Sequence, residues 1–157
     1  MRGVKTFIAV LALGLLAGCG VRAPGRVETV VITGFKHHLS VRGAKERNPI
    51  AASPEAVATG QKVFGYYCYS CHGLDGQNTG VPFAERMSPP VPPLTSKEVQ
   101  SYSDGQLKWI IENGISPSGM PASKGILNDD EIWQIIHYIR HLPAKGSLGE
   151  PKSYSGG

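Results

Sequence analysis

The stretch Cys68-Tyr69-Ser70-Cys71-His72 decides how this chain folds. Two cysteines separated by two residues and followed directly by a histidine form the attachment signature of a c-type haem. At this spacing the two thiols can reach the two vinyl groups of one haem and form thioethers, and the next side chain then lies over the iron. The run therefore predicts one covalent haem c, attached through Cys68 and Cys71, with His72 as an axial iron ligand. The second ring nitrogen of a metal-bound imidazole usually donates to a nearby acceptor, and we expect a backbone carbonyl here.

Two other chemistries use a pair of cysteines at this spacing. A redox-active disulfide of the thioredoxin type needs a strand–helix–strand setting, and no such pattern surrounds the run. A structural zinc site needs a second pair of ligands, and the third cysteine of the chain, Cys19, has a different role. Haem attachment is therefore the preferred interpretation.

The N-terminus has the pattern of a lipoprotein export signal. Arg2 and Lys5 precede an apolar run that is too short to cross a bilayer, which takes about 20 residues. The run ends in Leu-Ala-Gly-Cys19, which looks like a bacterial lipobox. We predict a signal peptide over residues 1–18 and lipidation of Cys19, which would anchor the protein at the periplasmic face of a membrane of the cell envelope.

Charge and composition divide the rest of the chain, which is long enough for one domain. Residues 20–47 carry six Lys and Arg against two Glu, and such a basic stretch beside a lipid anchor would lie against anionic headgroups. We therefore expect a lipidated N-terminus and basic tether over 19–52, a folded domain over 53–143 and a flexible tail over 144–157. The basic residues lie on the tether, so nothing indicates binding to nucleic acid.

Three helices are predicted for the folded domain, and each follows a residue that suits a helix N-cap. The expected helices span 54–67, 104–113 and 129–142, and the caps are Ser53, Ser103 and Asn128. Gly60 lies inside the first helix, where a glycine costs about 1 kcal/mol relative to alanine, so a close helix crossing is expected there. His137 and His141, on the last helix, are expected at the surface or at an edge. Long loops rich in Gly and Pro, over 73–94 and 115–126, complete an all-α fold around the haem.

The sixth iron position decides between an electron carrier and a haem enzyme. Met120 lies on a loop that a helix separates from His72, so it can approach the iron from the opposite side. Met87 is the other methionine outside the signal peptide, and we expect it to pack on the haem edge. His37 and His38 lie on the tether and are expected to be exposed. Met120 is therefore the predicted second axial ligand.

From about residue 48 to residue 143 the chain resembles the class I cytochromes c of the bacterial single-haem kind. The shared features are Gly60 and Phe64 ahead of the attachment run, the run itself, and the segments 102–107, 119–121, 130–132 and 138–140. The resemblance implies the class I fold, with three main helices and long loops around one covalent haem, and ligation by His72 and Met120. It also implies that Gly60 and Phe64 pack against Ile135 and Tyr138. A further implication is that a proline carbonyl accepts a hydrogen bond from the His72 ring, and the candidates are Pro89, Pro90, Pro92 and Pro93.

The expected function is electron transfer in a bacterial respiratory chain, without catalysis of a bond-making reaction. The partners would be a respiratory complex or a periplasmic dehydrogenase on one side and a terminal oxidase on the other. The alternative is a haem enzyme, or a gas or redox sensor, in which the sixth iron position is open.

Overall fold

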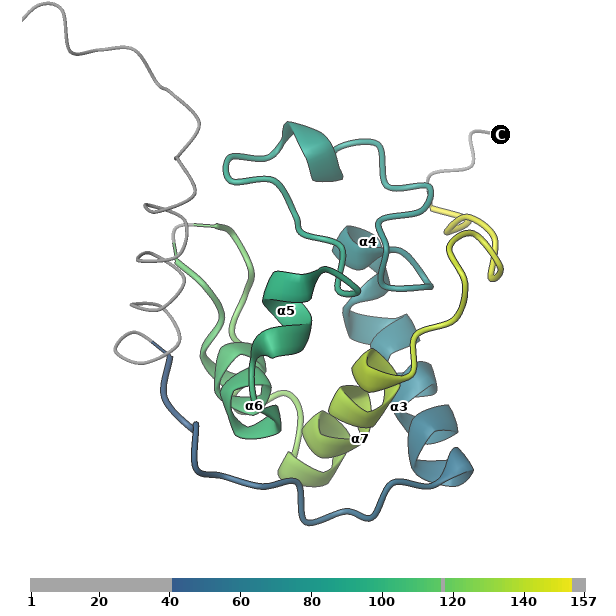
Figure 1. Cartoon of the computed structure of the whole chain (residues 1–157). Helices are drawn as coiled ribbons and strands as arrows, with labels where there is room; N and C mark the ends of the chain where they lie inside the picture. Colours follow the sequence, from purple (N-terminus) through teal and green to yellow (C-terminus); the bar gives the residue numbers. More distant parts are fainter. Residues whose placement is uncertain (1–40, 117, 154–157) are drawn as a thin grey trace, which may run out of the picture. The chain divides into compact units, whose positions relative to one another are not determined.

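The structure is a computed structural model that describes residues 41–116 and 118–153. The predicted signal peptide, the lipidation site Cys19, and His37 and His38 lie outside the described residues. The helices, in chain order, are α3 (Pro54–Tyr67), α4 (Tyr69–His72), the 3-10 helix η2 (Ala84–Arg86), α5 (Lys97–Ser101), α6 (Asp104–Asn113) and α7 (Asp129–Arg140). No strand occurs in the described part, so the fold is all-α as predicted (Figure 1).

The three main helices begin where the capping residues predicted. The Ser53 hydroxyl accepts a hydrogen bond from the Ala56 amide at the start of α3. Capping boxes begin the other two helices, with Ser103 and Gln106 at α6 and Asn128 and Glu131 at α7. Each box satisfies backbone N–H groups that have no partner within the helix. The last helix begins at Asp129 as predicted and ends at Arg140, two residues before the predicted end.

Helices α3 and α7 cross in direct contact at Gly60 (Figure 1). A Cβ atom built on Gly60 would lie 1.9 Å from the carbonyl oxygen of Gln134 and 3.0 Å from the backbone nitrogen of Ile135. One turn further on, the buried rings of Phe64 and Tyr138 meet edge to face, with centroids 5.2 Å apart. The predicted crossing is confirmed, and it explains why a helix interior contains a glycine.

Residues 43–52, which we had assigned to the tether, pack on the domain instead. Gly43 and Gly105 approach so closely that a Cβ atom on either would collide with the backbone of the other. The Asn48 side chain donates to the Trp133 carbonyl at 3.1 Å, and a ring nitrogen of His137 lies 2.8 Å from the Ile50 carbonyl oxygen. His137 is therefore buried against this segment and does not lie at the surface. Within the described residues, the packed part of the chain therefore starts about ten residues before the predicted boundary. The sequence did not reveal this because the contacts join residues 85 or more positions apart.

The C-terminal segment also differs from the prediction. Residues 143–153, the C-terminal strap, turn back from α7 along the loop that follows α4 (Figure 1). Pro151 is among the most deeply buried side chains. The prediction of a flexible tail is therefore wrong for residues 144–153, and residues 154–157 lie outside the described part.

Two further observations complete the fold. The short helix α5 lies in a segment for which we predicted no helix; Ser96 caps it by accepting from the Val99 amide. Within the described residues, no helix is both long enough and apolar enough to cross a membrane.

Candidate functional site

The attachment run lies on one helical turn at the end of α3. Cys68 is both the C-cap residue of α3 and the N-cap residue of α4. The amide of His72 donates a hydrogen bond to the Cys68 carbonyl at 3.0 Å. This turn brings Cys68, Cys71 and His72 together, and both cysteines are free thiols. Cys68 also packs against the hydrophobic core. The structure therefore gathers the three predicted attachment and ligand residues beside the core.

The environment of the Cys68 thiol does not favour redox chemistry. Burial, and to a smaller extent the negative charge of a Cys71 thiolate, raise the pKa of Cys68 to about 12. Thiols that exchange disulfides have a lowered pKa, because the thiolate is the reacting species. A thiol that stays protonated at neutral pH argues against the disulfide interpretation of this run.

His72 has the properties of an imidazole that serves as a metal ligand. Its side chain is partly buried, its Nδ1 atom is fully enclosed and has no hydrogen-bond partner in the protein, and its ring lies 6.3 Å from that of Phe64. Burial lowers the pKa of His72 to about 4, so the ring is neutral at physiological pH, which is the form that binds metals. A neutral imidazole beside two free thiols fits a covalent haem. The predicted hydrogen bond from His72 to a proline carbonyl is not present, since Nδ1 meets no acceptor.

Met120 lies on a loop held close to the end of α6. The Ile115 amide donates to the Met120 carbonyl at 3.1 Å, and Gly114 is so close to this carbonyl that a Cβ atom there would lie 2.4 Å from it. The Met120 side chain packs against the same core cluster as Cys68. The backbone therefore holds the predicted second ligand at the core that the attachment turn also contacts.

Met87, the alternative methionine, approaches the same loop. Its terminal methyl group lies 3.4 Å from where a Cβ atom of Gly119 would be, in ordinary van der Waals contact. The two loops that carry the methionines thus meet next to Met120. We expect Met87 at the haem edge, and the structure places its terminal methyl group close to Gly119 of the neighbouring loop.

Asp75 is a buried residue of the site that the sequence did not reveal. Its carboxylate accepts hydrogen bonds from the Gln77 amide at 2.9 Å, the Thr79 hydroxyl at 2.6 Å and the Gly146 amide at 2.7 Å. Burial raises the pKa of Asp75, but these hydrogen bonds outweigh it, and the pKa lies below the ordinary value. The aspartate between two glycines, Gly-Leu-Asp75-Gly, signals a turn, but it does not reveal the distant partner Gly146.

The geometry agrees with comparisons to known proteins. The family model described as "Cytochrome C oxidase, cbb3-type, subunit III" matches residues 55–139. This match covers more than half of the chain, so the chain belongs to this family of c-type cytochromes. Membership implies a covalently bound haem c, which the free thiols and the neutral imidazole can hold, and it indicates that the matched domain is a haem electron carrier.

Proteins of three organisms are similar to part of this chain. Cytochrome c6 of Euglena viridis is 30% identical over 86 residues, which are 52% of this chain and 86% of that protein. The quinohemoprotein alcohol dehydrogenase ADH IIB of Pseudomonas putida is 26% identical over 91 residues, which are 58% of this chain and only 12% of that enzyme. Among solved structures, a chain of the reducing HAO-like protein complex of Kuenenia stuttgartiensis is 25% identical, with a TM-score of 0.49 over 59% of this chain and 46% of that chain.

Proposed function

We propose that the protein is a single-haem electron carrier whose iron is bound by His72 and Met120 and which a lipid on Cys19 tethers to a membrane. The observation that carries this proposal is the attachment turn, which presents Cys68, Cys71 and His72 together beside the core. When bound, the haem supplies the one-electron Fe(II)/Fe(III) couple. The residues of the chain attach it, ligate the iron and exclude water from it.

Two observations support Met120 as the sixth ligand. Its side chain contacts the core cluster that includes Phe64, the residue whose ring also neighbours His72. Its backbone is fixed by the hydrogen bond with Ile115, so the loop presents the thioether from a constrained position. A thioether ligand favours Fe(II) and raises the reduction potential relative to a second histidine, which suits a carrier in the oxidising part of a respiratory chain.

The tether is proposed on the sequence alone. The lipobox-like run before Cys19 and the basic stretch after it suit attachment to an anionic membrane at its periplasmic face. Among the described residues, those near Gly43 already pack on α6, at Gly105. The chain outside the described residues would carry the anchor.

Redox partners follow from the same proposal. A quinol-oxidising complex or a periplasmic dehydrogenase would reduce the haem, and a terminal oxidase would accept its electron. The description of the matched family names a subunit of a cytochrome c oxidase, and one relative is a dehydrogenase. Both kinds of protein therefore contain domains of this type. A fixed subunit and a short-range shuttle are both compatible with a tethered domain.

The test of the proposal is the ligand state of the iron. Ferric wild-type protein should show the weak charge-transfer band of an iron–thioether bond, and ferrous protein should not bind carbon monoxide. Met120→Ala should abolish the band, admit carbon monoxide and lower the reduction potential. Met87→Leu, which conserves side-chain volume, is the matched control and should change none of these properties.

Two outcomes would overturn this assignment. If Met87→Leu removes the band and Met120→Ala does not, the ligand is the other methionine. If ferrous wild-type protein binds carbon monoxide readily, the sixth position is open, and a haem enzyme or sensor becomes the better description.

A further inference from the structure

We propose that the C-terminal strap, residues 143–153, is a positioning element of the haem site that acts on His72 through the loop 73–81. This inference rests on the proposed function, because His72 matters here as an iron ligand. The strap lies outside the residues that the cytochrome family model matches. Its contacts are therefore a feature of this chain beyond the family domain.

The strap touches the loop at several separate points. The Gln77 side chain donates to the Pro143 carbonyl at 2.8 Å, and the Gly146 amide donates to the Asp75 carboxylate at 2.7 Å. At Gly80 the backbone lies so close to the strap that a Cβ atom would lie 2.6 Å from the Cβ of Glu150. These contacts fix the strap along the length of the loop.

The Asp75 carboxylate links the strap to the loop, because it accepts hydrogen bonds from both. One carboxylate oxygen accepts from Gln77, and the other accepts from both Thr79 and Gly146. Hydrogen bonds to a charged acceptor are stronger than neutral ones. The same buried carboxylate therefore joins the two sides of the loop to the strap, and loss of the strap would leave it with one donor fewer and with water as a neighbour.

The loop in turn holds the backbone of His72. The Asn78 amide donates to the His72 carbonyl at 2.8 Å, which closes a turn that begins at the ligand and contains Asp75. The interior of the turn is filled, since a Cβ atom on Gly73 would lie 2.8 Å from the Thr79 nitrogen and 3.2 Å from an Asp75 carboxylate oxygen. Because the His72 ring has no acceptor at Nδ1, its orientation depends on this backbone and on packing.

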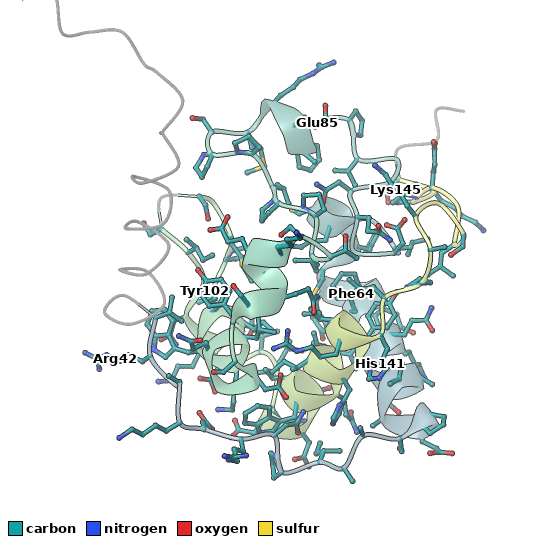
Figure 2. All side chains as sticks on the ribbon, viewed as in Figure 1. Arg42, Phe64, Glu85, Tyr102, His141 and Lys145 are labelled. Carbon is teal, nitrogen blue, oxygen red and sulfur yellow. The ribbon has the colours of Figure 1, made fainter. Side chains whose placement is uncertain are left out.

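The strap also lines an open pocket beside this turn, through Lys145. The pocket, of about 260 Å³, is lined by Asn78 and Gln77 of the loop, by Glu85 and Arg86 of η2, and by Lys145 of the strap, with Val81, Pro82 and Pro93. Figure 2 labels Glu85 and Lys145 on two of its walls. Without the strap, Lys145 no longer covers this side of the pocket, and the loop residues Gln77 and Asn78 that line it become more exposed.

The experiment compares four forms of the full-length holoprotein: wild type, a deletion of residues 144–157, Asp75→Asn, and Asp104→Asn as control. The Asp104 carboxylate, on α6, accepts a hydrogen bond from the Arg140 side chain, on α7. Its substitution therefore removes a hydrogen-bonded carboxylate that is not bonded to the loop. The readouts are hydrogen exchange at the Gln77 and Asn78 amides, the paramagnetic NMR shifts of the His72 ring, and the reduction potential.

The deletion and Asp75→Asn should each speed exchange of these amides by about tenfold or more, the effect expected when a hydrogen bond to a charged group is lost. Both should also move the His72 ring shifts and lower the reduction potential, because water near the iron favours the ferric state. Asp104→Asn should change none of the three. If Asp75→Asn yields no folded holoprotein, the deletion decides alone, since it removes no residue of any helix.

Unchanged His72 shifts and an unchanged potential would overturn the proposal, even with faster exchange, because the strap would then stabilise the loop without acting on the ligand. Failure of the proposed function has a different signature. In that case wild-type protein itself would lack the iron–thioether band or bind carbon monoxide in the ferrous state.

Discussion

The helix crossing at Gly60 can be tested with a pair of glycine substitutions in the same helix. In Gly60→Ala, the new methyl group would lie 1.9 Å from the Gln134 carbonyl oxygen and 2.4 Å from its carbon. Carbon and oxygen atoms at a comfortable separation are about 3.5 Å apart. Both colliding atoms belong to backbone, so α3 and α7 must separate by more than about 1 Å for the side chain to fit.

The cost follows from what that separation disturbs. The interface between α3 and α7 contains the buried pair Phe64 and Tyr138, and forcing extra volume into such a core costs about 1–3 kcal/mol or more. Because both colliding atoms belong to the backbone, which cannot move aside as a side chain can, we expect a cost at or above the upper end of that range. Alanine recovers about 1 kcal/mol of helix propensity, so we expect a net loss of about 2 kcal/mol or more in the free energy of unfolding.

Gly65→Ala is the matched control on the same helix. A Cβ atom on Gly65 would meet nothing within 4 Å, so this variant should gain about 0.5–1 kcal/mol from helix propensity alone. The assay is denaturant unfolding of oxidised holoprotein, with unchanged dependence on denaturant concentration as the sign that the same transition is compared. The two variants should shift stability in opposite directions. Equal stability of Gly60→Ala and wild type would refute the close crossing.

Three other predictions concern separate parts of the chain. Cys68→Ala combined with Cys71→Ala should leave no haem bound after denaturation on a gel, and haem retention would contradict the assigned attachment. Mass spectrometry of the mature protein should find Cys19 at the N-terminus with acyl groups, and an unmodified Cys19 would rule out the anchor. The pKa of Asp75 is lowered in the folded state, so its carboxylate stabilises the fold above its unfolded pKa and loses this contribution as pH falls through the folded pKa. Asp75→Asn should therefore flatten the decline in the free energy of unfolding below about pH 4. An unchanged decline would show that other groups cause it.

Local signals in the sequence predicted the main helices because the interactions that start them are local. Ser53, Ser103 and Asn128 each bond to an amide three residues further on, so a short stretch of chain is enough to reveal the start of a helix. The attachment run is equally local, since five consecutive residues contain both thiols and the ligand. The glycine in α3 was informative because its cost inside a helix needs a reason, and a close crossing supplied one.

The features that the sequence did not reveal depend on residues far apart in the chain. Asp75 and Gly146 are 71 positions apart, and His137 and Ile50 are 87 apart. An aspartate in a turn, or a histidine on a helix, does not indicate which distant backbone group it will meet, because that depends on how the elements pack. The sequence by itself therefore determined the cofactor class and the main helices, and it is the basis on which Cys68 and Cys71 are proposed as the attachment residues. Only the tertiary structure decided that residues 43–52 and the C-terminal strap pack on the domain, since these segments are held by long-range hydrogen bonds and close backbone contacts that leave no periodic pattern in the sequence.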